Sequence, residues 1–147
     1  MKTMKFSTPI KADPDKIWEV LWNDRTYREW TSAFSPDPQY AMSDGLVEGG
    51  RVHFLDGKGQ GMYSRIAKLE PSRKLTFEHL GTIKDGRERP EDEEMRKWKG
   101  AKESYVIDPN GDGCELKVEV DVADEHAGSF EDMFPKALAK VKQLAEQ

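Results

Sequence analysis

Cysteine is nearly absent from this chain, which has one, Cys114, among 147 residues. A single cysteine cannot form an intramolecular disulfide, so the sequence gives no support to a disulfide-stapled, secreted scaffold. A catalytic thiol would need a neighbouring base, and no histidine lies near Cys114 in the sequence. We therefore expect Cys114 to be a small structural residue.

Long apolar runs are absent as well. No stretch approaches the roughly 18–20 apolar residues that a membrane-crossing helix needs. The N-terminal residues Met1–Phe6 carry two lysines and no apolar signal core behind them. We therefore expect a soluble, cytoplasmic protein that does not insert into a membrane.

An excess of positive charge is also lacking. The chain has 23 Lys and Arg against 28 Asp and Glu, which gives a net charge of −5. An acidic balance repels phosphate backbones unless a local basic patch overcomes it. The basic clusters are interrupted by acids, as Glu88 interrupts Arg87 and Arg89. No nucleic-acid partner is expected.

Groups suited to catalysis or metal binding are few and scattered. The three histidines, His53, His79 and His126, lie far apart, with no His-x-x-x-His or Cys-x-x-Cys pair. The acids within Glu115–Asp121 alternate with apolar residues and are most simply a solvated strand face. The sequence therefore predicts no catalytic residue, no metal site and no cofactor.

What the chain does contain is periodic apolar residues at a length typical of one domain. It is 36% hydrophobic and 35% charged, and no repeat or linker divides it. We predict a single α+β domain spanning residues 1–147.

The apolar period changes twice along the chain. Alternation over Met4–Thr8 predicts a strand, and Asp13 before Pro14 predicts the start of a helix. A second short helix is expected over Arg25–Thr31, capped by Asp24. Residues 39–122 then favour strands, the clearest of which alternates from Leu116 to Val122.

The C-terminal segment returns to helical spacing, with apolar residues from Phe130 to Ala145. Ser129 is a candidate cap for this helix. Pro135 interrupts it, so we expect either a kink or a start nearer Asp132.

The segment Gly81–Lys102 is nearly all charge. Pro90, the acids after it and the lysines that follow predict a helix matched to its dipole. Two interpretations remain open: a solvated excursion anchored by Trp98, or a flap over the mouth of a cavity.

Several short motifs, taken in order, carry a family resemblance. They are Ile10–Pro14, Ile17–Trp18, Tyr27 and Trp30, followed by Gly49–Phe54, Glu70–Pro71, Lys74–Phe77 and Phe134–Leu138. The first set resembles the opening of the START-like, Bet v-type (SRPBCC) superfamily. The second set resembles the branch related to the C-terminal domain of the heat-shock chaperone ATPase activators. The charged segment is similar to that of a mostly bacterial subgroup.

This resemblance implies the helix-grip fold, an α+β architecture. In it, a curved antiparallel sheet of about six or seven strands wraps around a long C-terminal helix. Two short helices follow the first strand, and a cavity lies between the sheet and the long helix. The chain has no counterpart of the separate N-terminal domain of the eukaryotic co-chaperones, so we do not carry chaperone activation over. Because one fold hosts many functions, the resemblance names no ligand.

The candidate site consists of apolar and aromatic residues expected to face that cavity, with two polar groups among them. They are Trp30, Phe54, Phe77, His79, Tyr105, Phe134 and Leu138. His79 shares strand parity with Phe77. It is either a strand-end histidine that reaches water or a backbone carbonyl, or a hydrogen-bonding group that orients a ligand. Aromatic walls with a few polar groups are typical of ligand pockets, although such residues also form ordinary cores.

Three functions follow from these residues. The first is a non-enzymatic domain that binds an apolar or amphipathic small molecule, with His79 and Tyr105 as polar handles. The second is a protein-interaction or co-chaperone-like module with a protein partner. The third, least favoured because no constellation is visible, is an enzyme that uses the cavity for acid–base chemistry.

Overall fold

Eight strands form one antiparallel sheet in the part of the chain that the computed structural model describes, residues 1–35, 39–43 and 45–147. Their order is β1-β8-β7-β5-β4-β3-β2, and β6 pairs with β5. The strands are β1 (Lys2–Ile10), β2 (Tyr40–Ser43), β3 (Arg51–Leu55), β4 (Gly61–Glu70), β5 (Lys74–Lys84), β6 (Arg87–Glu88), β7 (Lys102–Asn110) and β8 (Gly113–Val122).

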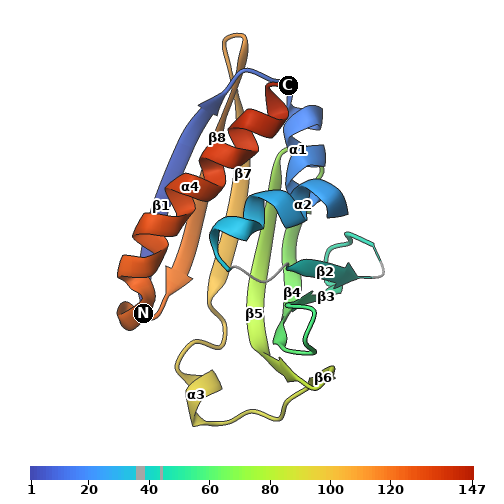
Figure 1. Ribbon diagram of the computed structural model, residues 1–147, viewed down its shortest axis with the longest axis vertical. Coiled ribbons are helices and arrows are strands. Elements are labelled where there is room, and N and C mark those ends of the chain that lie inside the picture. The colour runs from blue at the N-terminus through green and yellow to red at the C-terminus, as the bar shows by residue number, and fades with distance from the viewer. Residues whose placement is uncertain (36–38, 44) are drawn as a thin grey trace.

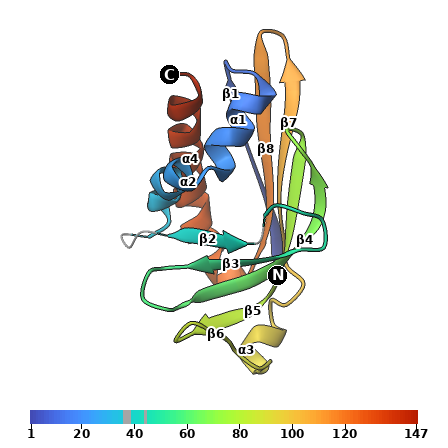
Figure 2. The same cartoon turned by 90° about the vertical axis from the view of Figure 1, so that its right-hand side faces the viewer.

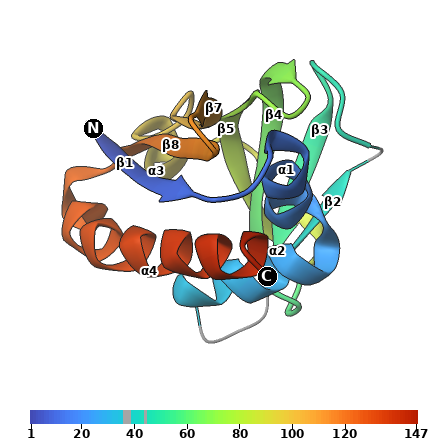
Figure 3. The ribbon, with the colours of Figure 1, turned by 90° about the horizontal axis from the view of Figure 1, so that it is seen from above.

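The helices are α1 (Pro14–Trp22), α2 (Asp24–Trp30), α3 (Glu93–Arg96) and α4 (Ala127–Ala145), with short 3-10 turns η1 (Thr31–Ala33) and η2 (Asp124–His126). Helix α4 runs obliquely across the sheet (Figure 1). In the side view α1, α2 and α4 lie on the same face of the sheet (Figure 2). From above, the strands curve from β1 round to β3 beside α4 (Figure 3). The predicted helix-grip architecture is confirmed.

Two of the eight strands were not visible in the sequence, which predicted about six or seven. Strand β2 has four residues, of which the last three are exposed, and β6 has two exposed residues. Strands this short and exposed leave no alternation to detect.

Strand β8 has the predicted buried face and solvent-exposed face. Leu116, Val118, Val120 and Val122 are buried, and the residues between them face outward or lie at the margin. They face the apolar stripe of α4, which buries Phe134, Leu138 and Val141 among others.

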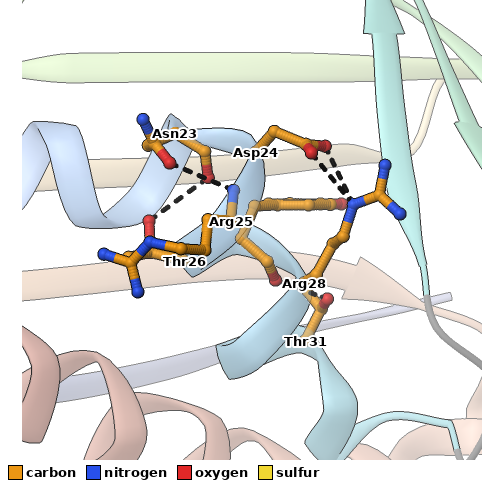
Figure 4. Close-up of polar contacts among 7 residues, drawn as sticks. Asn23, Asp24, Arg25, Thr26, Arg28 and Thr31 are labelled. Carbon is orange, nitrogen blue, oxygen red and sulfur yellow. Dashed lines mark hydrogen bonds and ion pairs between the residues drawn. The ribbon is translucent and has the colours of Figure 1, made fainter.

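The first helix starts as predicted, and the second starts one residue earlier. The Asp13 carboxylate accepts the Lys16 N–H at 2.8 Å, and Pro14 follows at the first helical position. For α2 the cap is Asn23 instead of Asp24, since its side-chain oxygen accepts the Arg25 N–H at 3.0 Å (Figure 4).

Asp24 has a different role in α2. It is the first helical residue, and both of its carboxylate oxygens lie 3.0 Å from Nε of Arg28 (Figure 4). The Arg28 guanidinium also lies 5.0 Å from the ring centroid of Tyr40 in β2. These contacts hold α2, which carries Trp30, against the neighbouring strand.

Helix α4 starts earlier than either expectation. It begins at Ala127, before both Ser129 and Asp132, and no side chain caps it. Pro135 lies inside the helix on its exposed side. The carbonyl that its missing N–H leaves without a helical partner can therefore bond to water.

The charged segment is mostly not helical. Gly81–Lys84 belongs to β5, which pairs with β6 around a turn at Asp85 and Gly86, both with positive φ. The helix is only the single turn α3, whose cap Asp92 accepts the Met95 N–H at 2.8 Å.

The expected anchor of this segment was also wrong. Met95 is buried, with 2% of its surface exposed, whereas Trp98 is half-buried. A Cβ added to Gly81 would clash with Cε of Met95, so Gly81 leaves the space that this methionine fills. Because Met95 anchors the segment, the Trp98 side chain can line a cavity.

Candidate functional site

A hollow of about 290 Å³ lies between the sheet, the end of α2 and the first half of α4. We call it the inner hollow. Its walls are mainly aromatic: Tyr27, Trp30, Thr31, Phe34, Gln39, Phe54, Met62, His79, Glu103, Tyr105, Phe130, Met133 and Phe134.

Five of the seven residues predicted for the site line this hollow: Trp30, Phe54, His79, Tyr105 and Phe134. Phe77 does not, and lines a smaller hollow of about 200 Å³ beside α1 and α2. Leu138 is a buried core residue and lines none of the hollows found in the described part of the chain.

The aromatic walls are fixed by contacts with one another and with the backbone. The indole N–H of Trp30 donates to the Leu21 carbonyl in α1 at 3.1 Å, which orients the ring. The Trp30 ring centroid lies 6.1 Å from that of Tyr105, in an edge-to-face arrangement. Phe34 lies edge-on to Phe134 at 4.8 Å. These rings are therefore held in place before any ligand arrives.

Four polar side chains from three neighbouring strands meet at one end of the inner hollow. Ser64 Oγ in β4 lies 2.6 Å from Nδ1 of His79 in β5. Nε2 of His79 lies 3.2 Å from Oε1 of Glu103 in β7. The Tyr105 hydroxyl, also in β7, donates to Oε2 of Glu103. We call these four residues the polar cluster.

The hydrogen bonds of the polar cluster determine which of its atoms carry a hydrogen. An ionised carboxylate only accepts, so Nε2 of His79 carries the hydrogen that Glu103 receives. In the neutral imidazole Nδ1 is then an acceptor, and the buried Ser64 hydroxyl donates to it. Ser64 thus orients the ring that binds Glu103.

Electrostatics keep Glu103 ionised. Burial by itself would raise the pKa of its carboxyl. The hydrogen bond from His79, the charge that His79 can carry and the bond from Tyr105 together outweigh burial, so the pKa lies below its ordinary value. Burial and the nearby Glu103 charge raise the pKa of both Tyr27 and Tyr105, which therefore stay protonated.

The sequence search missed Glu103 and Ser64, and with them the cluster. One signal was available for Glu103, because it shares strand parity with the inward residues Tyr105 and Ile107. Ser64 shares strand parity with the buried Ile66, but its partner could not be predicted, because a register shift in the β4–β5 pairing sets it opposite His79.

A second, outer hollow of about 450 Å³ adjoins the first. Met62, His79, Glu103 and Phe130 line both. Part of its wall comes from the charged segment, through Glu94, Lys97, Trp98 and Ala101, and the facing wall comes from Val120–His126. The charged segment is therefore a wall of this hollow.

Within residues 1–35, 39–43 and 45–147, no group of three His, Cys, Asp or Glu side chains is arranged to hold a metal ion. None of the helices described there is long and apolar enough to cross a membrane.

The architecture and the site together define a helix-grip domain with an aromatic hollow between sheet and long helix. No protein-family model and no curated protein sequence matches the chain. The Aha1 dimer from Colwellia psychrerythraea matches in structure with a TM-score of 0.69 and 20% identity, over 99% of this chain and 97% of that one.

Two further solved structures share the architecture. MLL2253 from Mesorhizobium loti has a TM-score of 0.73 at 16% identity, over 97% of this chain and 96% of that one. CalU16 from Micromonospora echinospora has a TM-score of 0.65 at 17% identity, over 97% of this chain and 75% of that one. At these identities the matches show the fold. The Aha1 match has the fold that the sequence motifs imply.

Proposed function

We propose that this chain binds an apolar or amphipathic small molecule in the inner hollow, with the polar cluster orienting the molecule. The observation that supports this proposal is an aromatic hollow whose lining includes one hydrogen-bonded set of ionisable groups. Ligand sites usually combine apolar walls with a few convergent polar groups. The cytoplasmic location predicted from the sequence remains part of this proposal.

The size of the site supports a ligand. The inner hollow alone, at about 290 Å³, lies near the lower end of the range for small-molecule pockets, which is roughly 300–1,000 Å³. The outer hollow shares four residues with it and extends the space available. A core that merely filled the gap between sheet and helix would be packed to leave few voids larger than a water molecule.

Acid–base catalysis is a second candidate, because His79 and Glu103 are within reach of anything bound in the hollow. A general base is most effective when its pKa lies near the working pH. The interactions around Glu103 lower its pKa, so its carboxylate is a weak base that stays ionised. For Glu103, this favours binding over proton transfer.

A blind ligand screen tests the proposal. Native mass spectrometry of the purified chain should detect a co-purified small molecule. Thermal-shift assays with fatty acids, steroids, flavonoids and alkylamines should find compounds that raise the melting temperature, because a ligand of the folded state stabilises it. If no compound binds and none co-purifies, the proposal is wrong.

A further inference from the structure

The Glu103 carboxylate sits where the inner and outer hollows meet. We propose that the ligand is an amphipathic amine whose protonated nitrogen lies against this carboxylate, an inference that rests on the proposed function. The apolar part of the ligand occupies the inner hollow, and Glu103 is the residue that selects the charge of the head group.

The first argument is access. The Glu103 side chain is 24% exposed, whereas that of His79 is 8% exposed, so the carboxylate is the more open of the two to the hollows. Each of its oxygens has one protein donor, His79 on Oε1 and Tyr105 on Oε2. A carboxylate has about four lone-pair sites, so each oxygen can accept a further hydrogen bond.

The second argument is the scarcity of positive charge in the inner hollow. Of the described residues that line the inner hollow, none is Lys or Arg, and His79 is the only titratable base among them. His79 is therefore the one described lining group besides an incoming ligand that can carry positive charge there, and it contacts Oε1 alone. A buried charge is costly unless an opposite charge pairs with it, and a protonated amine supplies both that charge and N–H donors.

The third argument is the sign of charge around the outer hollow. Its lining holds two fixed cations, the Lys97 ammonium and the N-terminal ammonium of Met1, against a larger set of acids. These acids are Glu94, Glu103, Asp121, Asp124 and Glu125. An excess of one sign of charge in the lining of a hollow concentrates ions of the other sign. A fatty-acid carboxylate at the same place would face like charge.

The fourth argument is the nature of the walls. Aromatic ring faces carry partial negative charge and attract cations. The described lining of the inner hollow includes seven such rings, those of Tyr27, Trp30, Phe34, Phe54, Tyr105, Phe130 and Phe134. Alcohols of the same chain length would gain the apolar contacts without this attraction.

Three probes of equal chain length, decylamine, decanol and decanoate, test the proposal by isothermal titration calorimetry at pH 7. We expect decylamine to bind about tenfold or more tightly than decanol, and decanoate to bind most weakly. Equal affinities for all three would overturn the amine assignment and leave the proposed function standing. Absence of binding by every probe would overturn both. This comparison uses the unaltered chain and needs no substitution.

The variant Glu103→Gln removes the charge and keeps the shape of the side chain. In it, decylamine and decanol should bind within about twofold of each other. The control is Glu119→Gln, at an exposed position of β8 next to Lys5, which should keep the preference for the amine. A preference that survives in Glu103→Gln would overturn the role assigned to Glu103.

Discussion

His79 and Glu103 contact each other diagonally across β5 and β7, where Glu103 pairs with Phe77 and its Oε1 lies 3.2 Å from imidazole Nε2 of His79. The backbone of His79 is tied to the residues just before β7. Its N–H donates to the Ala101 carbonyl and its carbonyl accepts the Gly100 N–H, both at 2.8 Å. One residue thus joins the polar cluster to the end of the charged segment, so a ligand at Glu103 is in a position to affect that segment.

Acid should remove the stabilising effect of the Glu103 charge. The pKa of Glu103 in the folded chain lies below its ordinary value of 4.5, because bonds from His79 and Tyr105 outweigh burial. Ionised Glu103 therefore stabilises the fold above that value, and the effect disappears as the pH falls through the folded-state pKa. At pH 7, Glu103→Gln should lower the free energy of unfolding by about 1–2 kcal/mol.

Urea unfolding of both chains from pH 7 to pH 3 measures this difference. The gap between the unaltered chain and Glu103→Gln should narrow below about pH 4. A gap that stays constant over this range would show that the carboxylate gains no stabilisation from its charge. Glu119→Gln, at an exposed site, should show a small difference throughout.

Binding and folding should separate at Phe130 but not at Trp30. Trp30 is 2% exposed and belongs to the core as well as to the inner hollow, so Trp30→Ala should cost about 3–5 kcal/mol of stability. Phe130 is half-buried and lines both hollows. Phe130→Ala should cost less and abolish the ligand-induced rise in melting temperature. If Phe130→Ala kept the full rise, the shared wall of the two hollows would not contact the ligand.

Ligand binding should slow amide exchange in the charged segment. Trp98 and Lys99 donate backbone hydrogen bonds to the Met95 carbonyl in a single turn, a structure expected to open readily. A ligand that reaches the outer hollow contacts Trp98 and should stabilise this turn. Hydrogen–deuterium exchange with and without decylamine measures the effect, with β8 amides as the internal control. Equal exchange rates in both states would favour the interpretation of this segment as solvated surface.

The elements that sequence predicted well are those defined by near neighbours. The alternation from Leu116 to Val122 and the Asp13–Pro14 helix start depend on residues within a few positions of one another. The start of α4 at Ala127 was missed because no side chain caps it, which leaves no local signal.

The polar cluster escaped prediction for the opposite reason. Ser64, His79 and Glu103 lie 15 and 24 positions apart in the sequence, and only strand pairing brings them together. Strand parity was enough to turn His79 and Tyr105 inward. The partners of His79 depend on which strands are neighbours and on the register shift beside Ser64. Neither can be predicted from the local sequence pattern.

The long helix should carry much of the stability of the fold. Leu138 is 2% exposed within the apolar stripe of α4, and Leu138→Ala removes its transfer energy and leaves a void, costing about 2–5 kcal/mol. A domain of this size has only about 5–15 kcal/mol in total, so the midpoint of urea unfolding should fall sharply. Lys136→Ala, at an exposed position of the same helix, is the matched control and should change the midpoint little.

Removal of the helix is the stronger form of the same test. A chain that ends before Ser129 loses nearly all of α4 and uncovers the buried face of β8, including Val118 and Val120. Exposed apolar sheet surface associates with other copies, so we expect this chain to aggregate, as measured by size-exclusion chromatography with light scattering. A truncated chain that stayed monomeric and unfolded cooperatively would show that the sheet folds without the helix. Helix α4 would then not be required for the fold that forms the inner hollow, and this result would contradict the binding proposal.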